Sequence, residues 1–281
     1  MSIVAGVRCS FRGKDAGSVD SGAIDATEDV ASGRAARPGG SADISPDPPN
    51  MEWPGESRRH PSRGSATYAV RAPLARWLER EGAGTAGLRI LDVGCGVKPY
   101  YPFFAGAEGY VGVDVVERPA VDVIGPVEAL PVEDASFDVV LCNQVLEHCD
   151  DPAQAVRELR RVTASGGRVL ASTHGVQVYH PSPNDLWRWT HTGLEKLFRD
   201  NGDWATLEVR PGAGTTACIG MLLTHYIDLM AARARLRAAG RPLVAAVNAA
   251  AEAIDGRVAS LREPIPGSVF ANYHVTARVP A

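Results

Sequence analysis

The stretch RILDVGCG, residues 89–96, restricts the fold of this chain more than any other feature. Its apolar run is too short for a helix and is followed at once by Gly94 and Gly96, so it predicts a buried strand that ends in an open loop. Glycine accepts a positive φ and has no Cβ, which lets a ligand approach the main chain. The pair predicts a ligand site at the strand end, although glycine turns after strands are also common for packing reasons.

Strand-like and helix-like segments alternate along the rest of the chain, which predicts an α/β sheet with helices on both faces. The expected strands are Leu88–Val93, Tyr110–Val115, Phe137–Cys142, Arg168–Thr173, Trp204–Val209 and Tyr273–Val279. The expected helices are one over 65–81, a short one near Tyr100–Ala105, one opened by Asp151-Pro152 and ended by Gly166-Gly167, and one opened by a capping box over Thr192–Glu195.

Two segments fall outside this alternation. Residues 1–50 are rich in Gly, Ser, Ala, Asp and Pro, which predicts a disordered tail before a domain over 51–281. A start codon placed too far upstream of Met51 is an alternative explanation for the tail. Residues 215–260 are rich in alanine and leucine and predict two or three helices inserted before the last strand, as either a cap over the substrate or an outer helical layer.

Composition excludes some classes of partner. The chain has 281 residues, a net charge of −4 and arginines without a basic stripe, so neither a nucleic-acid nor a membrane partner is expected. The five cysteines form no CxxC pair, which fits a reducing compartment. No signal peptide is evident, and the apolar stretch 218–232 is interrupted by His225 and Asp228 and is shorter than the roughly 20 residues of a membrane span. We therefore expect a soluble cytoplasmic protein.

The nature of the ligand follows from two further positions. Asp114 ends the second expected strand, 18 residues after Gly96, where a carboxylate can accept hydrogen bonds from the hydroxyls of a ribose. A dinucleotide fingerprint needs a third glycine beside the pyrophosphate, but Pro99 stands there. S-adenosylmethionine, which has a ribose and an adenine but no phosphate, therefore fits better than NAD. Lys98 is expected either to face solvent or to pair with the carboxylate of this ligand.

The segment from Ile90 to Thr173 resembles the class I S-adenosylmethionine-dependent methyltransferases of the type 11-like group, through LDVGCG, LP…SFDVV and VLEH in that order. The resemblance implies a Rossmann-like, seven-stranded sheet with the cofactor across its first half. Pro126 replaces an aspartate that many members place near adenine, so backbone groups of the next two residues are the better candidates there. The implied cofactor-binding residues are Asp92 near the loop or the cofactor amino group, Gly94 and Gly96 along the methionine and ribose, Asp114 on the ribose hydroxyls, Val127 and Glu128 beside the adenine, and Asn143 under the methionine moiety.

The downstream loop HPSPNDLWRWT, residues 180–190, resembles a subgroup of these enzymes found with sugar, polysaccharide and specialised-metabolite pathways. In the functional interpretation His180 or Asp185 accepts a proton from an acceptor hydroxyl, Arg188 holds an anionic group or Asp185, and the tryptophans stack on a ring. In the structural interpretation Asp185 and Arg188 pair to fix the loop, while Trp187 and Trp189 fill the core.

The VLEH motif offers a third candidate base, His148. The resembled ubiquinone O-methyltransferases bind a divalent metal through an acidic residue, a Glu and a His, but here the matching positions are Gln144, Glu147 and His148, so no metal is expected. His148 is then a loop hydrogen-bonding residue or a proton acceptor.

The sequence as a whole predicts a methyltransferase that uses S-adenosylmethionine to methylate an oxygen of a small-molecule or sugar-containing metabolite. The alternative is a catalytically idle accessory protein that binds the same cofactor. The possibility of a homodimer is left open.

Overall fold

The computed structural model describes residues 53–181 and 183–281, which belong to one compact unit, Pro48–Ala281. The expected tail over residues 1–50 lies outside the described residues.

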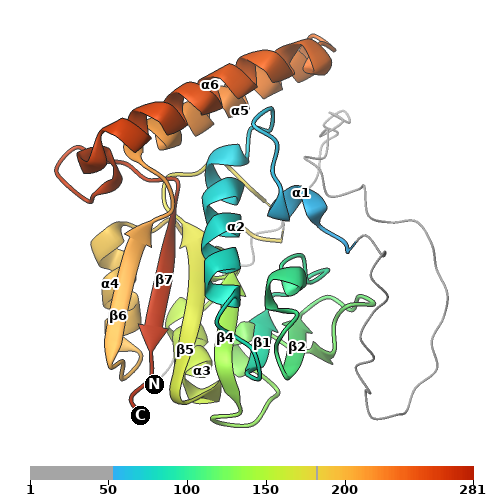
Figure 1. The fold of residues 1–281 in the computed structure, drawn as a ribbon, viewed down its shortest axis with the longest axis vertical. Coiled ribbons are helices and arrows are strands. Elements are labelled where there is room, and N and C mark those ends of the chain that lie inside the picture. The colour runs from blue at the N-terminus through green and yellow to red at the C-terminus, as the bar shows by residue number, and fades with distance from the viewer. Residues whose placement is uncertain (1–52, 182) are drawn as a thin grey trace, which may run out of the picture. The chain divides into compact units, whose positions relative to one another are not determined.

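A seven-stranded sheet forms the centre of the unit, with the strand order β3-β2-β1-β4-β5-β7-β6. Every pairing is parallel except those of β7, which runs antiparallel to both β5 and β6 (Figure 1). This arrangement confirms the predicted α/β class and brings the carboxyl ends of β1, β2, β4 and β5 to one edge of the sheet. The strands are β1 Arg89–Val93, β2 Gly109–Asp114, β3 Val123–Ile124, β4 Phe137–Asn143, β5 Thr163–His174, β6 Thr206–Pro211 and β7 Asn272–Arg278.

Helices cover both faces of the sheet, as predicted (Figure 1). On one face, Leu74 and Leu78 of α2 pack against Ile90 of β1 and Leu141 of β4. On the opposite face, α3 and α4 pack against the alternate side chains of the same strands. The helices are α1 Glu56–Arg59, α2 Tyr68–Gly82, α3 Pro152–Val162, α4 His191–Asp200, α5 Thr215–Arg233 and α6 Arg237–Arg257, with 3-10 turns η1 Tyr101–Phe104, η2 Val127–Ala129, η3 Leu146–His148 and η4 Ala259–Arg262.

The start of α3 was predicted correctly and the start of α4 was not. The carboxylate of Asp151 accepts a hydrogen bond from the Gln154 amide at 2.9 Å, and Pro152 takes the first helical position. For α4 the cap is Thr190, whose hydroxyl accepts from the Gly193 amide at 3.1 Å. The expected box at Thr192 is wrong because Thr190 is the last extended residue and Thr192 already lies inside the helix.

The glycine pair after α3 also has a different role from the predicted one. The helix ends at Val162, and β5 begins at Thr163, so Gly166 and Gly167 lie within the strand. The register between β4 and β5 shifts there, and a Cβ on Gly167 would stand 2.8 Å from the Asp138 carbonyl oxygen. The pair therefore allows an irregular strand beside a close backbone, which is a common use of glycine in sheets.

The segment between β6 and β7 folds into a helical hairpin of α5 and α6, in the place where an insertion was predicted. Ala217 and Met221 of α5 pack on Ala69 and Val70 of α2. The hairpin lies beyond the end of the sheet toward which β6 points (Figure 1). Within the described residues, α5 alone has the length and apolar composition of a membrane span, and 28% of that apolar stretch is buried.

Candidate cofactor and acceptor site

The glycine loop after β1 is fixed to the end of β2. The amides of Gly94 and Cys95 donate to the Val113 carbonyl oxygen at 2.8 and 3.1 Å. Gly94 has φ 69°, and a Cβ on it would stand 2.3 Å from Cγ2 of Val145. Gly96 has φ 54°, and no atom lies within 4 Å of the place of its missing Cβ. The first glycine is thus required by packing and backbone, whereas the second leaves an open approach to the main chain.

Asp114 lies at the end of β2 and faces this loop, as the sequence predicted. Its Oδ2 accepts a hydrogen bond from the Gly96 amide at 2.9 Å, and its Oδ1 accepts from the Val116 amide at 2.9 Å. These contacts position the carboxylate, and each carboxylate oxygen retains a further acceptor direction. The residue can therefore bind a vicinal diol while it orders the loop.

Asp92 and Lys98 are both buried, with partners that the sequence did not predict. The carboxylate of Asp92 accepts from the Tyr110 hydroxyl at 2.8 Å, and burial raises the pKa of this carboxyl to about 7. Lys98 was expected at the solvent or on the cofactor, but its ammonium donates to Asp122 at 2.5 Å and its side chain is 10% exposed. Gly112 leaves the space for it, since a Cβ there would stand 2.5 Å from Cε of Lys98.

Of the residues expected around the adenine and methionine, Val127 and Glu128 lie on η2, after β3, and Asn143 ends β4. Val127 is buried, and Oε1 of Glu128 accepts from the Asp150 amide at 3.1 Å. Oδ1 of Asn143 accepts from the Ser172 hydroxyl at 3.1 Å, but its Nδ2 is buried without a hydrogen-bond partner in the described part of the chain. A buried amide donor without a partner carries a desolvation cost of about 1–3 kcal/mol, so a ligand acceptor at this atom would be stabilising.

These observations fit an adenosyl cofactor. The backbone of Gly96 is open, the Asp114 carboxylate beside it can accept from a diol, and Asn143 at the end of β4 has a buried donor without a partner in the described part of the chain. No phosphate-binding glycine follows, because Lys98 and Pro99 continue the loop.

Glu147, in the middle of η3, and His174, the last residue of β5, form a buried pair. Oε1 of Glu147 lies 3.2 Å from Nε2 of His174, and its Oε2 accepts from the Thr173 hydroxyl at 2.8 Å. Although the first distance is that of an ion pair, burial raises the pKa of Glu147 to about 7 and lowers the pKa of His174 to about 3. Both shifts favour the uncharged forms, so below about pH 7 the pair is a neutral acid beside a neutral imidazole.

His148 and His180 lie beside this pair. The ring of His180 is centred 5.8 Å from that of His148 and 6.3 Å from that of His174. Nδ1 of His148 contacts the Asn184 carbonyl oxygen, so this nitrogen carries the proton and Nε2 is left with a lone pair. Burial lowers the pKa of His148. The imidazole is therefore neutral at pH 7 and in the tautomer of a proton acceptor. Within the described residues, no three His, Cys, Asp or Glu side chains are placed to hold a metal ion.

The loop that leaves β5 has the contacts of the structural interpretation at Asp185, Arg188 and Trp189, but not at Trp187, which does not fill the core. The guanidinium of Arg188 donates to both carboxylate oxygens of Asp185, one of them at 2.9 Å, and Asp185 also accepts from the His180 amide at 3.0 Å. Arg188 lowers the pKa of Asp185, which makes this carboxylate a weak base. Trp189 packs on the core. Trp187 stacks on Trp189, with the ring centroids 5.7 Å apart, and is 40% exposed.

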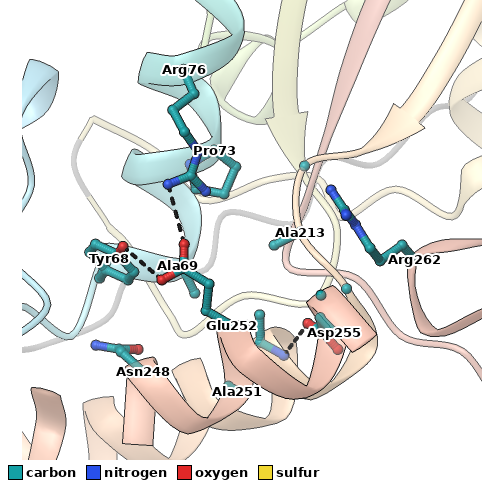
Figure 2. A pocket seen from close by; sticks show the side chains of 14 residues that line it. Tyr68, Ala69, Pro73, Arg76, Ala213, Asn248, Ala251, Glu252, Asp255 and Arg262 are labelled. Atoms are coloured by element: carbon teal, nitrogen blue, oxygen red, sulfur yellow. Dashed lines mark hydrogen bonds and ion pairs between the residues drawn. The ribbon is translucent and has the colours of Figure 1, made fainter. Parts of the chain in front are cut away.

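A cavity of about 360 Å³ lies between α2, the start of α5 and α6 (Figure 2). Glu252 accepts there from the Tyr68 hydroxyl at 3.1 Å and from Arg76 at 3.4 Å, and Arg262 has no hydrogen-bond or ion-pair partner within the described part of the chain. One wall is Gly212, whose amide donates to Asn272 at 2.9 Å. Asn272 is the β7 partner of His174. The wall thus lies two strands from His174, roughly 10 Å away at the usual strand spacing.

Sequence reasoning named candidate cofactor-side residues and three candidate bases, but it gave His174 no role of its own on the downstream loop and considered Glu147 only as a metal ligand. The signal for them was their position: Glu147 precedes His148 directly, and His174 ends the fifth strand.

Comparison with known proteins identifies a domain within this unit. Residues 91–171 match the family described as "Methyltransferase domain". Over 127 residues the chain is 40% identical to malonyl-[acyl-carrier protein] O-methyltransferase of Erwinia pyrifoliae, covering 40% of this chain and 48% of that protein. Over 117 residues it is 34% identical to ubiquinone biosynthesis O-methyltransferase of Acinetobacter baumannii, covering 34% of this chain and 48% of that protein. The chain thus spans about half the length of the curated relatives it matches.

Among solved structures, phosphoethanolamine N-methyltransferase 2 of Haemonchus contortus in complex with S-adenosyl-L-methionine superposes with a TM-score of 0.50 at 18% identity. The superposition covers 75% of this chain and 53% of that one. At this identity the likeness concerns the fold, and the fold agrees with the strand order described above.

Proposed function

We propose that this chain, in which residues 91–171 match a methyltransferase domain family and the sheet has the strand order given above, transfers the methyl group of S-adenosylmethionine to a hydroxyl oxygen of a small-molecule acceptor. The observation that carries the proposal is that two features lie at the same edge of the sheet. One is the open glycine loop beside Asp114, and the other is a neutral His148 whose Nε2 is free to accept a proton. The first feature suits the cofactor and the second suits deprotonation of the acceptor.

The cofactor would be held by the residues on the first half of the sheet. Asp114 would accept the ribose hydroxyls, the buried Nδ2 of Asn143 would donate to the methionine moiety, and Val127 with Glu128 would border the adenine. When bound, S-adenosylmethionine supplies a methyl group on a positively charged sulfur, which is reactive without further activation. The protein's own task is to align the acceptor, exclude water and take up the acceptor's proton.

His148 is the group best placed to take up that proton. Its Nε2 has a free lone pair because Nδ1–H donates to the Asn184 carbonyl. When Nε2 gains a proton, the same carbonyl stabilises the positive charge on the ring, as a hydrogen-bonded acceptor does in other imidazole bases. His180 remains a second candidate. It is exposed on the loop that follows β5, and its ring lies near the rings of His148 and His174. Asp185 is the weakest of the three, since its charge is engaged by Arg188.

The acceptor would enter from the side of the long loop and the helical hairpin. The HPSPNDLWRWT loop supports a sugar-containing acceptor, because the exposed face of Trp187 offers a surface on which a ring can stack. The relatives whose names describe O-methylation support oxygen as the acceptor atom. We also propose that the reaction takes place in the cytoplasm, in agreement with the free thiols of the four described cysteines, Cys95, Cys142, Cys149 and Cys218.

The test has a binding stage and a transfer stage. Calorimetry should show that S-adenosylmethionine and S-adenosylhomocysteine bind to the purified chain and that NADH does not. Radiolabel should then pass from methyl-labelled S-adenosylmethionine to at least one member of a panel of hydroxylated sugars, nucleotide sugars and phenols, and the His148→Ala variant should bind the cofactor without this transfer.

The rival functions predict different results. An idle accessory protein would bind S-adenosylhomocysteine but transfer no label to any acceptor in the panel. An NAD-dependent reductase would bind NADH and not S-adenosylhomocysteine, which would contradict the assignment of the glycine loop.

A further inference from the structure

The α5–α6 hairpin exposes an apolar face that no described part of the chain covers. This face, here called the α5 apolar face, is formed by large side chains that are each between 41% and 60% exposed: Ile219, Leu222, Leu223, Tyr226, Leu229 and Met230. Their spacing places them on one side of the helix, opposite the buried residues that pack on α2 and α6. Contiguous apolar patches of this kind on a folded protein mark interaction sites.

A basic cluster lies at the end of this face. Arg233 continues the apolar stripe at the carboxyl end of α5, Arg235 is in the turn, and Arg237 and Arg241 occupy the first turns of α6. All four are exposed, and none of them has a hydrogen bond or ion pair from its side chain to any residue within 53–181 or 183–281. The chain as a whole has a net charge of −4, so this end of the hairpin differs in sign from the rest of the protein.

We propose that the hairpin docks on an anionic lipid bilayer, with the α5 apolar face in the headgroup region and the four arginines on the lipid phosphates. The proposal departs from the expectation of no membrane partner, which was based on net charge and on the linear sequence. A helix with large apolar residues on one face and arginines at its edge is the pattern of proteins that lie in the membrane interface rather than span it. The arginines would be attracted by the negative surface potential of such a membrane. The proposal concerns binding alone and does not depend on the methyl-transfer activity.

Charge decides between a lipid surface and a second copy of this chain. The hairpin offers a second copy three carboxylates, Asp228, Glu252 and Asp255. Glu252 is already bound by Arg63 at 2.8 Å, and Asp255 accepts from the Thr216 and Ala217 amides. One carboxylate thus remains for four arginines, whereas an anionic bilayer offers a phosphate to each of them.

The position of the hairpin relates membrane docking to the expected entry of the acceptor. It lies beyond the carboxyl end of β6 (Figure 1), and α6 forms a wall of the cavity between α2, α5 and α6 (Figure 2). A bilayer under the hairpin would therefore lie on the same side of the molecule as the expected acceptor entrance.

The experiment is a flotation assay with the full chain and vesicles of defined composition. The protein should float with vesicles of phosphatidylglycerol and phosphatidylcholine in equal parts, less with phosphatidylcholine alone, and less as sodium chloride is raised. The variant Arg233→Gln/Arg237→Gln should lower the partition coefficient by about 25-fold, since each arginine contributes about fivefold near an anionic surface. The matched control Arg80→Gln/Arg278→Gln, which removes two exposed arginines outside the hairpin, should leave it unchanged.

A second variant tests the apolar contribution. Leu222→Ser/Tyr226→Ser should lower partitioning at least about tenfold, because it removes two large apolar side chains from the buried face. Circular dichroism and S-adenosylhomocysteine binding like those of the wild type would show that each variant is folded. Equal binding by all variants would overturn the proposal. So would a dimer in light scattering that Leu222→Ser/Tyr226→Ser dissociates while vesicles bind neither form, which would assign the α5 apolar face to a subunit interface.

Discussion

The two loop glycines differ in a way that a pair of alanine substitutions can measure. Both have a positive φ, 69° at Gly94 and 54° at Gly96. A Cβ on Gly94 would stand 2.3 Å from Cγ2 of Val145, whereas a Cβ on Gly96 would meet no atom within 4 Å. Gly96→Ala is therefore the matched control for Gly94→Ala, because it has the backbone strain without the steric clash.

The expected free energies of unfolding follow from these two contributions. A left-handed conformation costs a non-glycine residue about 1–2 kcal/mol, and the lower chain entropy of alanine in the unfolded state offsets about 0.4–1 kcal/mol. Gly96→Ala should thus destabilise the protein by about 1 kcal/mol. Gly94→Ala should lose about 1–3 kcal/mol more, since Val145 must move within a packed core.

Urea unfolding of four proteins separates the clash from the strain: wild type, Gly94→Ala, Val145→Ala and the double variant. Trimming Val145 removes the atom that a Cβ at position 94 would meet, so the double variant should be more stable than the sum of the single effects predicts, by about 1–3 kcal/mol. The same cycle with Gly96→Ala should be additive.

Two results would refute this reasoning. If Gly94→Ala and Gly96→Ala destabilise the protein equally, contact with Val145 does not determine the need for glycine at position 94. If Val145→Ala fails to rescue Gly94→Ala, the cost at Gly94 lies in the backbone alone.

Further expectations concern the carboxylates and histidines of the site. Asp114→Ala should weaken S-adenosylhomocysteine binding by about 1–3 kcal/mol through lost charged hydrogen bonds, and an unchanged dissociation constant in calorimetry would contradict the role of Asp114. Since burial raises the pKa of Glu147 from 4.5 to about 7, the folded state binds a proton that the unfolded state releases, and this contribution to stability is lost as pH rises from about 4.5 to 7. The stability of Glu147→Gln relative to wild type should therefore rise by about 2–3 kcal/mol between pH 5 and 7 in urea unfolding, and a constant difference would show that Glu147 is ionised when folded. His148→Ala should lower turnover about 100-fold or more with cofactor binding unchanged. In the wild type the acid limb of the rate should lie below pH 6.5, because burial lowers the pKa of His148. His180→Ala should also lower turnover without affecting cofactor binding, and normal turnover would leave His180 with a structural role.

The cofactor half of the protein could be predicted from sequence because its determinants are local. The apolar run before Gly94 fixes β1, the acidic residue at position 114 ends β2, and Asp151-Pro152 begins α3 in the predicted place. Each of these signals depends on backbone chemistry within a few residues, so no knowledge of distant partners was needed.

Apart from the cap of α4 and the end of α3, which are local errors, what the sequence did not predict lies where distant parts of the chain meet. Lys98 is buried because Asp122, 24 residues later, accepts from its ammonium and because Gly112 on β2 leaves room for its side chain. The pairing of Glu147 with His174 joins η3 to the end of β5. The four arginines of positions 233–241 are visible in the sequence, but the exposure of the α5 apolar face beside them emerges only from the way α5 packs.

The antiparallel pairing of β6 with β7 has a consequence for how this protein can diverge. Pro211 and Tyr273 are paired neighbours, so the chain leaves the sheet for the hairpin and returns to it at nearly the same point. Everything between those two residues could be exchanged, lengthened or shortened without moving any strand that borders the glycine loop. Descendants of one ancestral enzyme could in this way acquire new acceptors by replacing the single segment between β6 and β7 while they keep the same methyl donor.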